Sequence, residues 1–408
     1  MADYSNKDRC GASHCRSKNS STNVHPYYNA RTLSTGAEVA QWIWQQYEYI
    51  DDLEFLRRNY PVMRESARSL LAYATHDANG KLHTFPSNAH ETEWDVHDPT
   101  TDVSAMRALF PDVIKAATLL KTDADLVGQV RKELVLLPKL PKLPIVAVAS
   151  PGVLVAPDAD RADTIISASH DPGAESHNTE NLGLEPVWPY GLIGDDGPPH
   201  ALGIRTYLNR LNKNEDDWSA DPLQAARLGL ADEFKSSALA LTERYQTFPA
   251  GLASFMGPEF YVEQIGVLTD ALQAALVQDY DGLIRIAPAW PKDWDADGTV
   301  YIQHECKVTI QMRQGKVVTV GIETGSAATI RVRNPWPGQS VEAIDAGTLA
   351  VILPASSANV LEFSAQAKTA YLLRQVSNAG SPLPFAAISG TRSTAPKSLG
   401  SRIIGIAR

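Results

Sequence analysis

The chain has 408 residues, of which 44% are hydrophobic, and this length predicts a large core divided over two or three domains. Asp and Glu number 47 against 37 Lys and Arg, and the resulting net charge of -10 is not offset by any basic stripe. Because such a surface repels phosphate backbones and anionic lipid, nucleic-acid-binding and membrane-binding proteins are excluded as classes.

The first 30 residues are polar and aperiodic, which predicts a disordered extension. They contain two of the three cysteines, and three cysteines are too few for a disulfide framework and lack the spacing of a structural zinc site. The chain begins without an apolar signal core and contains no run of eighteen apolar residues. As written it is therefore expected in the cytoplasm. The three cysteines are Cys10, Cys15 and Cys306.

Paired helices are predicted from residue 31 to residue 282, because apolar residues recur there at intervals of three and four. Between residues 138 and 196 this pattern is interrupted by many Pro and Gly turn signals, which indicate a long irregular excursion with one short hairpin. The predicted helices cover residues 34–50, 53–75, 100–120, 123–137, 200–211, 221–245 and 258–279.

After Gly282 the apolar period changes to two, which predicts antiparallel strands up to about residue 375. The predicted fold class is α+β multidomain: a partial (α/α)6 toroid of paired helices followed by an antiparallel β-sandwich. A toroid is favoured over an open solenoid because no repeat of 33 to 45 residues is present. The predicted divisions are an extension over 1–30, a helical domain over 31–282, a sandwich over 283–375 and a low-complexity tail over 376–408.

Acidic and aromatic residues are concentrated in "PSNAHETEWDVHDPTTD", residues 86–102. A solvated acidic loop, a metal site and the carboxylate end of an active site are all compatible with this composition. Glu91 is flanked by His90 and Trp94, so partial desolvation is expected to keep its proton near neutral pH. Glu93 and Asp95 alternate with Glu91, and in an extended segment all three face one side, so Glu93 is a second candidate for an acid.

Other polar residues have weaker signals. Asp102 lies at the start of a predicted helix, where an N-cap or first-turn role is favoured over sugar binding. His177 and Asn178 lie in the irregular excursion and are candidates for binding sugar hydroxyls. A zinc site built from the histidines and aspartates of this excursion, such as His170, Asp171 and His177, lacks any His-x-x-x-His spacing and is rated below sugar binding. Aromatic rings that could pack on a pyranose are Trp94, Trp188, Tyr190 and Trp290, although Trp290 is better explained as a structural residue.

Five segments resemble consecutive landmarks of glycoside hydrolase family 95, the α-L-fucosidases and their relatives. They are "STGAEVAQWIWQQYEYIDDLEFLRRNYPVMRESA", "PSNAHE" with "TTDVSAMRALF", "ESHNTENLGLEPVWP", "FYVEQIGVLTDALQAALVQ" and "LIRIAPAWPKDW". Their order across residues 31 to 300 makes the resemblance far more specific than any one of them. The resemblance implies an (α/α)6 barrel and an inverting hydrolysis without metal or other cofactor, acting on an oligosaccharide or glycan.

The resemblance also implies roles for two glutamates. Glu91 takes the place of the general acid of a Pro-Ser-x-Ser-Pro-Glu motif, with Ala89 and His90 as departures from that motif. Glu263 takes the place of an Asp that orients the catalytic base. The Asn-x-Asn pair that supplies the base has no counterpart before Ser34, so the chain is interpreted as the C-terminal portion of such an enzyme.

The resulting hypothesis is an inverting glycosidase acting on a terminal α-linked sugar such as L-fucose, with Glu91 and Glu263 as catalytic residues. Trp94, His177, Asn178 and Trp188 are the predicted binding residues. Two alternatives stay open: a related (α/α)6 glycosidase with another sugar, and a remnant without catalysis that only binds glycans. An incomplete toroid would also expose apolar helix faces, which predicts self-association.

Overall fold

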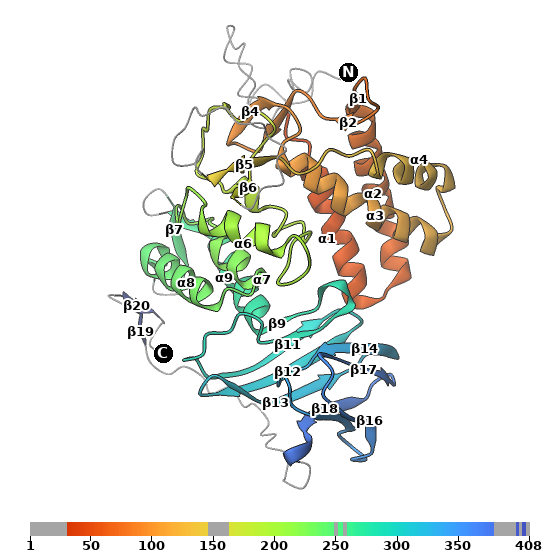
Figure 1. Ribbon diagram of the computed structural model, residues 1–408, viewed down its shortest axis with the longest axis vertical. Coiled ribbons are helices and arrows are strands. Elements are labelled where there is room, and N and C mark those ends of the chain that lie inside the picture. The colour runs from red at the N-terminus through yellow and green to blue at the C-terminus, as the bar shows by residue number, and fades with distance from the viewer. Residues whose placement is uncertain are drawn as a thin grey trace. The chain divides into compact units, whose positions relative to one another are not determined.

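The computed structural model describes residues 31–145, 163–248, 252–255, 259–378, 397–399 and 402–404. In these residues helices dominate the first part of the chain and antiparallel strands the second (Figure 1). The predicted mixed class of helix and sheet is therefore confirmed. The predicted extension over 1–30 and most of the predicted tail over 376–408 lie outside the described residues.

The chain forms two compact units. The first combines Met1–Tyr47 with Asp52–Lys213, and the second combines Glu48–Asp51 with Asn214–Arg408. This division falls inside the helical region that the sequence assigns to one domain, so it differs from the boundary predicted at residue 282. In the described part of the chain, no helix is both long enough and apolar enough to span a bilayer.

Four long helices build the core of the first unit: α1 (Thr35–Ile50), α2 (Leu53–Tyr73), α3 (Thr100–Leu120) and α4 (Ala124–Leu134). Helix α2 contacts α3, which in turn contacts α4. Met106, Leu109 and Phe110 of α3 are fully buried in the cluster that these helices share. The helices predicted from apolar spacing are thus confirmed, because each covers part of a common core.

Short strands and turns complete the first unit. The described part of the excursion after residue 138 contains one antiparallel strand pair, β5 with β6, and the residues that connect the two strands lie mostly outside the described part. It continues through the 3-10 turn η2 (Leu182–Leu184) to helix α6 (His200–Leu208). The strand pairs are β1 (Thr75–His76) with β2 (Leu82–His83), β3 (Ser87–Ala89) with β4 (Glu93–Val96), and β5 (Lys142–Pro144) with β6 (Thr164–Ile166).

The second unit begins with helices α7 (Asp221–Arg227), α8 (Ala231–Tyr245) and α9 (Glu263–Leu276), and α7 contacts both of the others. The start predicted for the last helix, residue 258, is wrong. Glu259 lies in strand β8 (Glu259–Tyr261), which pairs with β7 (Ala253–Phe255). Glu259 and Glu263 therefore do not share a helix face, and the Phe260 side chain in the same strand is 64% exposed.

The predicted antiparallel sheet is present in the second unit. Six strands run in the order β11-β12-β13-β18-β15-β16, and β14 pairs with β17 in a separate two-stranded sheet. Apolar side chains of both sheets enter one buried cluster. The bounds are β11 (Ala296–Ile302), β12 (Cys306–Arg313), β13 (Lys316–Glu323), β14 (Ala328–Arg333), β15 (Val341–Asp345), β16 (Val351–Ser356), β17 (Val360–Ala365) and β18 (Ala370–Gln375).

Six short elements remain in the described part of the second unit. Strands β9 and β10 form a two-stranded pair around a 3-10 turn, and β19 pairs with β20 near the C-terminus. Their bounds are β9 (Val277–Gln278), η3 (Tyr280–Gly282), β10 (Arg285–Ile286), η4 (Val376–Asn378), β19 (Lys397–Leu399) and β20 (Arg402–Ile404).

Candidate active site

The acidic segment that follows residue 86 folds as a β-hairpin in the first unit. Strand β3 pairs antiparallel with β4, so that Ser87 lies opposite Val96 and Ala89 opposite Glu93. Glu91 is therefore carried by the turn between the strands. His90 enters this turn with φ of 46°, in the left-handed region that side chains other than Gly rarely adopt. Such a backbone persists only where its surroundings hold it in place.

A buried ion pair holds His90. Its Nε2 lies 2.7 Å from Oε1 of Glu185 and 3.8 Å from Oε1 of Glu38 on α1, and the Tyr190 hydroxyl donates to the same Glu38 oxygen at 3.2 Å. Burial lowers the pKa of His90, but the carboxylates of Glu185 and Glu38 outweigh it and raise the pKa to about 10. A protonated His90 thus ties the turn to α1 and to the segment after η2.

Sequence reasoning missed this cluster. Glu38 and Glu185 stand far from His90 in the sequence and belong to no short motif, so no local signal could have paired them. Tyr190, which the sequence offers as a sugar-stacking ring, is only 4% exposed and serves the cluster instead.

Glu91 itself is exposed at the tip of the turn. The expected partial desolvation of this carboxylate is therefore wrong. The indole Nε1 of Trp94 donates to the backbone oxygen of Glu91 at 3.0 Å, so Trp94 fixes the backbone of the turn. The Glu91 side chain is presented to solvent, where a substrate can reach it.

Two of the predicted binding residues lie together beside the turn. The Trp94 and His177 rings stack with centroids 4.0 Å apart and planes 21° from parallel, and His177 N donates to Thr92 O at 2.8 Å. The next residue, Asn178, accepts a hydrogen bond from Thr179 N at 2.8 Å through its side-chain oxygen. Trp188 is half-buried in the turn after η2, where its N–H donates to Leu184 O at 3.1 Å.

Glu93 and Asp95, the two carboxylates that alternate with Glu91, have different surroundings. Glu93 is partly buried and its Oε2 accepts from the Ser169 hydroxyl at 2.6 Å. Burial raises the pKa of Glu93 to about 7; the Ser169 hydrogen bond opposes this and the Asp171 charge adds to it. Asp95 forms an ion pair with Arg31. The surroundings of Glu93 thus favour its protonated form.

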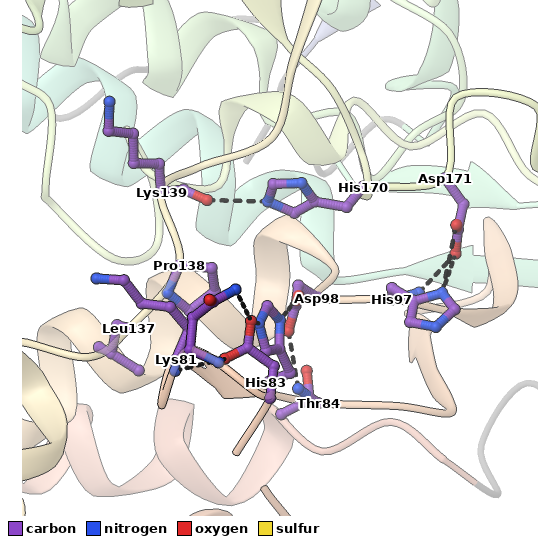
Figure 2. Close-up of polar contacts among 12 residues, drawn as sticks. Lys81, His83, Thr84, His97, Asp98, Leu137, Pro138, Lys139, His170 and Asp171 are labelled. Atoms are coloured by element: carbon purple, nitrogen blue, oxygen red, sulfur yellow. Dashed lines mark hydrogen bonds and ion pairs between the residues drawn. The ribbon is translucent and has the colours of Figure 1, made fainter. Parts of the chain in front are cut away.

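Two histidines near the hairpin, His83 and His97, are paired with carboxylates, whereas His170 contacts the Lys139 backbone oxygen (Figure 2). His97 binds Asp171 through its backbone N at 2.6 Å and through Nδ1 at 3.0 Å, and Phe85 stacks on its ring. His83 Nδ1 contacts Asp98, whose other oxygen accepts from Thr84 N at 2.8 Å. Within the described ranges, no group of three or more His, Cys, Asp or Glu residues is arranged to hold a metal ion.

Asp102 lies in the first turn of α3 and is fully buried. The position before the helix is taken by Pro99 without a side-chain cap, so of the two positions expected for Asp102 the N-cap is wrong and the first turn is confirmed. Burial raises the pKa of Asp102 to about 7, against the opposing effect of the Ser87 and Thr84 hydroxyls. The side chain is therefore only partly ionised near neutral pH.

A cavity of about 160 Å³ adjoins the hairpin in the first unit. Its lining residues include Thr92 and Glu93 of the hairpin, and Ser176 and Glu180 of the segment that also carries His177. Glu180 accepts a hydrogen bond from the Thr92 hydroxyl at 2.6 Å, which joins the hairpin to this segment. The volume is roughly ten times what one water molecule requires.

Residues 14–149 match the glycosyl hydrolase family 95 catalytic domain, and this range includes the whole hairpin with Glu91. The resemblance seen in the motifs is thereby confirmed. The chain is a relative of glycosyl hydrolase family 95. It is 22% identical over 322 residues to alpha-L-fucosidase 2 of Arabidopsis thaliana, an alignment that covers 73% of this chain and 36% of that protein. The chain thus spans little more than a third of the length of this curated relative.

Two solved structures resemble this family 95 relative at low identity. A protein from the human microbiome whose proposed identity is kojibiose phosphorylase has 10% identity and a TM-score of 0.46, with 82% of this chain and 50% of that chain covered. The alpha-L-rhamnosidase of Streptomyces avermitilis in complex with L-rhamnose has 13% identity and a TM-score of 0.42, with 83% and 32% covered.

Glu263 lies outside the part matched to family 95 and belongs to the second unit. It is the first residue of α9 and is exposed, and the Tyr261 hydroxyl donates to its Oε2. The Glu263 carboxylate oxygens are hydrogen-bond acceptors, as a group that orients other groups requires.

Proposed function

We propose that this chain forms part of a glycoside hydrolase that removes a terminal α-linked sugar, such as L-fucose, with inversion. One observation carries the proposal: the family 95 match contains a hairpin whose turn presents Glu91 to solvent beside the Trp94–His177 ring pair. In this proposal the helices belong to an (α/α)6 toroid of which the chain holds a part, and the sheets of the second unit form the terminal sandwich.

Inversion needs two groups on opposite faces of the sugar. A carboxylic acid protonates the leaving oxygen, while a base about 6.5–9.5 Å away activates the attacking water. The motif assigns the acid to Glu91. Glu263 is proposed to orient the base or its water, as its charged position at the start of α9 would allow.

The sugar is proposed to bind beside the hairpin turn. The stacked Trp94 and His177 rings provide an apolar platform for one face of a pyranose. The Asn178 amide and the Trp188 indole would supply polar contacts to its hydroxyl groups. Oligosaccharides or glycans are therefore the proposed partners, with water as the second substrate.

Two further functions stay as alternatives. A chain that only binds glycans is favoured by the exposure of Glu91. A related glycosidase for another sugar would use the same residues. Self-association through helix α1 is also proposed, because Trp42 on this helix is 59% exposed; a monodisperse monomer in light scattering would contradict it.

The test compares hydrolysis of 4-nitrophenyl α-L-fucoside, α-L-galactoside and α-L-rhamnoside by the purified chain. The Glu91→Gln variant removes the proposed acid, and Glu65→Gln, an exposed glutamate of α2, is the matched control. Loss of an acid group is worth about 10²–10⁴ in rate. Turnover that is retained by Glu65→Gln and lost in Glu91→Gln supports the proposal. No turnover on any sugar from folded protein supports the glycan-binding alternative.

A further inference from the structure

The turn that carries Glu91 is closed by a hydrogen bond from Thr92 N to Ala89 O at 3.0 Å, so His90 and Glu91 occupy its two central positions. The φ of His90 is 46°, in the region that Gly and Asn adopt most readily among the residues. A histidine thus stands where a smaller residue would suit the backbone better. What it adds to this turn is its imidazole ring.

The imidazole is held by carboxylates from two other parts of the first unit. Its Nε2 lies 2.7 Å from Glu185 Oε1 and 3.8 Å from Glu38 Oε1. The side chains of His90 and Glu38 are each 21% exposed and that of Glu185 is 12% exposed, so salt and water screen these charges only weakly. Two further carboxyl groups, Glu180 and Asp102, also interact with the charge on the ring. The turn is therefore anchored to the body of the unit through a cation.

The residue on the other side of Glu91 is held as well. The Thr92 hydroxyl donates to Glu180 Oε2 at 2.6 Å, and Thr92 O accepts from His177 N at 2.8 Å. The indole Nε1 of Trp94 donates to Glu91 O at 3.0 Å. Groups outside the turn thus fix the backbone on both sides of Glu91, although the side chain of Glu91 is exposed.

This arrangement decides where the Glu91 carboxyl group can lie. An exposed side chain has little packing around it, so its position depends on the backbone that carries it. A proton donor must come within hydrogen-bond reach of the leaving oxygen. A displacement of about 1 Å can cost about 10²-fold in rate.

We propose that His90 is a positioning residue for Glu91: its ion pair with Glu185 and Glu38 holds the turn so that the Glu91 carboxyl group reaches the leaving oxygen. This inference rests on the proposed function. His90 acts through the backbone of the next residue and not on the sugar. Loss of the ion pair is therefore expected to slow protonation of the leaving group, which lowers kcat, and to leave KM unchanged.

The experiment measures kcat and KM of the full chain for methyl and 4-nitrophenyl glycosides of α-L-fucose, α-L-galactose and α-L-rhamnose. Methoxide is a poor leaving group and needs the acid, whereas 4-nitrophenolate leaves with little help. His90→Asn removes the cation and keeps a residue that tolerates the positive φ. It is expected to lower kcat on the methyl glycoside by about 10–10²-fold, and far less on the 4-nitrophenyl glycoside. His76→Asn, which removes a similar contact with Glu133 at 2.7 Å, is the control and is expected to change neither.

A second variant tests the ion pair itself. Glu185→Gln should give the same substrate-selective loss as His90→Asn. The double variant should lose no more than the larger single loss, because both substitutions remove one interaction. A merely structural role of His90 would lower the amount of active protein and so reduce both substrates by the same factor. Should these variants not fold, Glu38→Gln is expected to give a smaller loss with the same selectivity; its amide oxygen can still accept from the Tyr190 hydroxyl.

The outcomes that overturn the inference are distinguishable from failure of the proposed function. Full activity of His90→Asn, or an equal loss on both substrates, means that His90 does not position Glu91, while the proposed function stands. Losses that add in the double variant mean that His90 and Glu185 act separately, which also overturns the inference. An equal effect on both substrates decides in the same way for Glu38→Gln. If the folded wild-type chain turns over none of these glycosides, the proposed function fails and the inference fails with it.

Discussion

The ion pair of His90 with Glu185 predicts a stability that depends on pH. The change is His90→Gln, which removes the cation and leaves the buried Glu185 carboxylate without its partner at 2.7 Å. Removing one member of a buried ion pair typically costs about 3–5 kcal/mol, because the other charge stays buried and unpaired. A loss of this size is a large fraction of the stability of an ordinary domain.

The change in the pKa of His90 on folding gives the size and the sign of this pH dependence. The pKa of His90 rises from 6.5 to about 10 on folding, and each pKa unit corresponds to about 1.4 kcal/mol. Protonation therefore favours the folded chain, by up to about 5 kcal/mol. This contribution is fully present below pH 6.5 and is lost as pH rises toward 10. Between pH 6 and pH 9 it falls by about 3 kcal/mol.

The assay is urea unfolding, followed by far-UV circular dichroism at pH 6 and pH 9. The free-energy cost of His90→Gln should be about 4 kcal/mol at pH 6 and about 1–2 kcal/mol at pH 9. His76→Gln is the control: His76 contacts Glu133 at 2.7 Å but is 45% exposed, so its cost should stay below about 1 kcal/mol at both pH values. An equal cost of His90→Gln at pH 6 and pH 9 would refute a charged His90 in the folded chain.

Three further substitutions test the packing of the first unit. Gly183→Ala would place a Cβ 2.3 Å from the Ile166 carbonyl oxygen, so it should lower the urea midpoint by the equivalent of about 1–3 kcal/mol. Gly173→Ala is the control and should leave the midpoint unchanged, because a Cβ there meets no atom within 4 Å. Equal midpoints for the two variants would contradict the close approach at Gly183. Asp52→Ala removes the N-cap of α2 and should cost about 1 kcal/mol in thermal unfolding, so an unchanged Tm would speak against the cap. Phe110→Ala, at a fully buried site, should cost about 3–5 kcal/mol by urea titration, and a cost below 1 kcal/mol would show that α3 is not in the core.

Local rules predicted most of the helices of the first unit. The turn between α1 and α2 could be placed because Asp52 is a strong N-cap, and its carboxylate accepts from Glu54 N at 2.8 Å and Phe55 N at 3.1 Å. The strands after residue 282 could be predicted because apolar residues alternate where one face of a sheet is buried. Each of these signals is carried by residues that are close together in the sequence.

The start of α9 could not be predicted in the same way. The run around Phe260 and Tyr261 fits helical spacing, but these residues pair with β7, and strand pairing depends on a partner outside the run. The contacts of His90 with its carboxylate partners could not be predicted for the same reason. Its carboxylates come from α1 and from the segment after η2, and only the fold brings Glu38 and Glu185 to one ring.

The assignment of the acid shows where such a limit affects function. Alternation along the segment predicted that Glu91 and Glu93 face the same side, which requires an extended backbone through both residues. The left-handed conformation of His90 starts a turn there, and the alternation is broken between the two glutamates. A motif transfers a role by position in the sequence, whereas the pKa of a carboxyl group is decided by what surrounds it. Glu91 and Glu93 are only two residues apart, yet Glu91 is exposed in the turn while Glu93 is partly buried and bonded to Ser169, so their surroundings differ in a way that spacing alone does not predict.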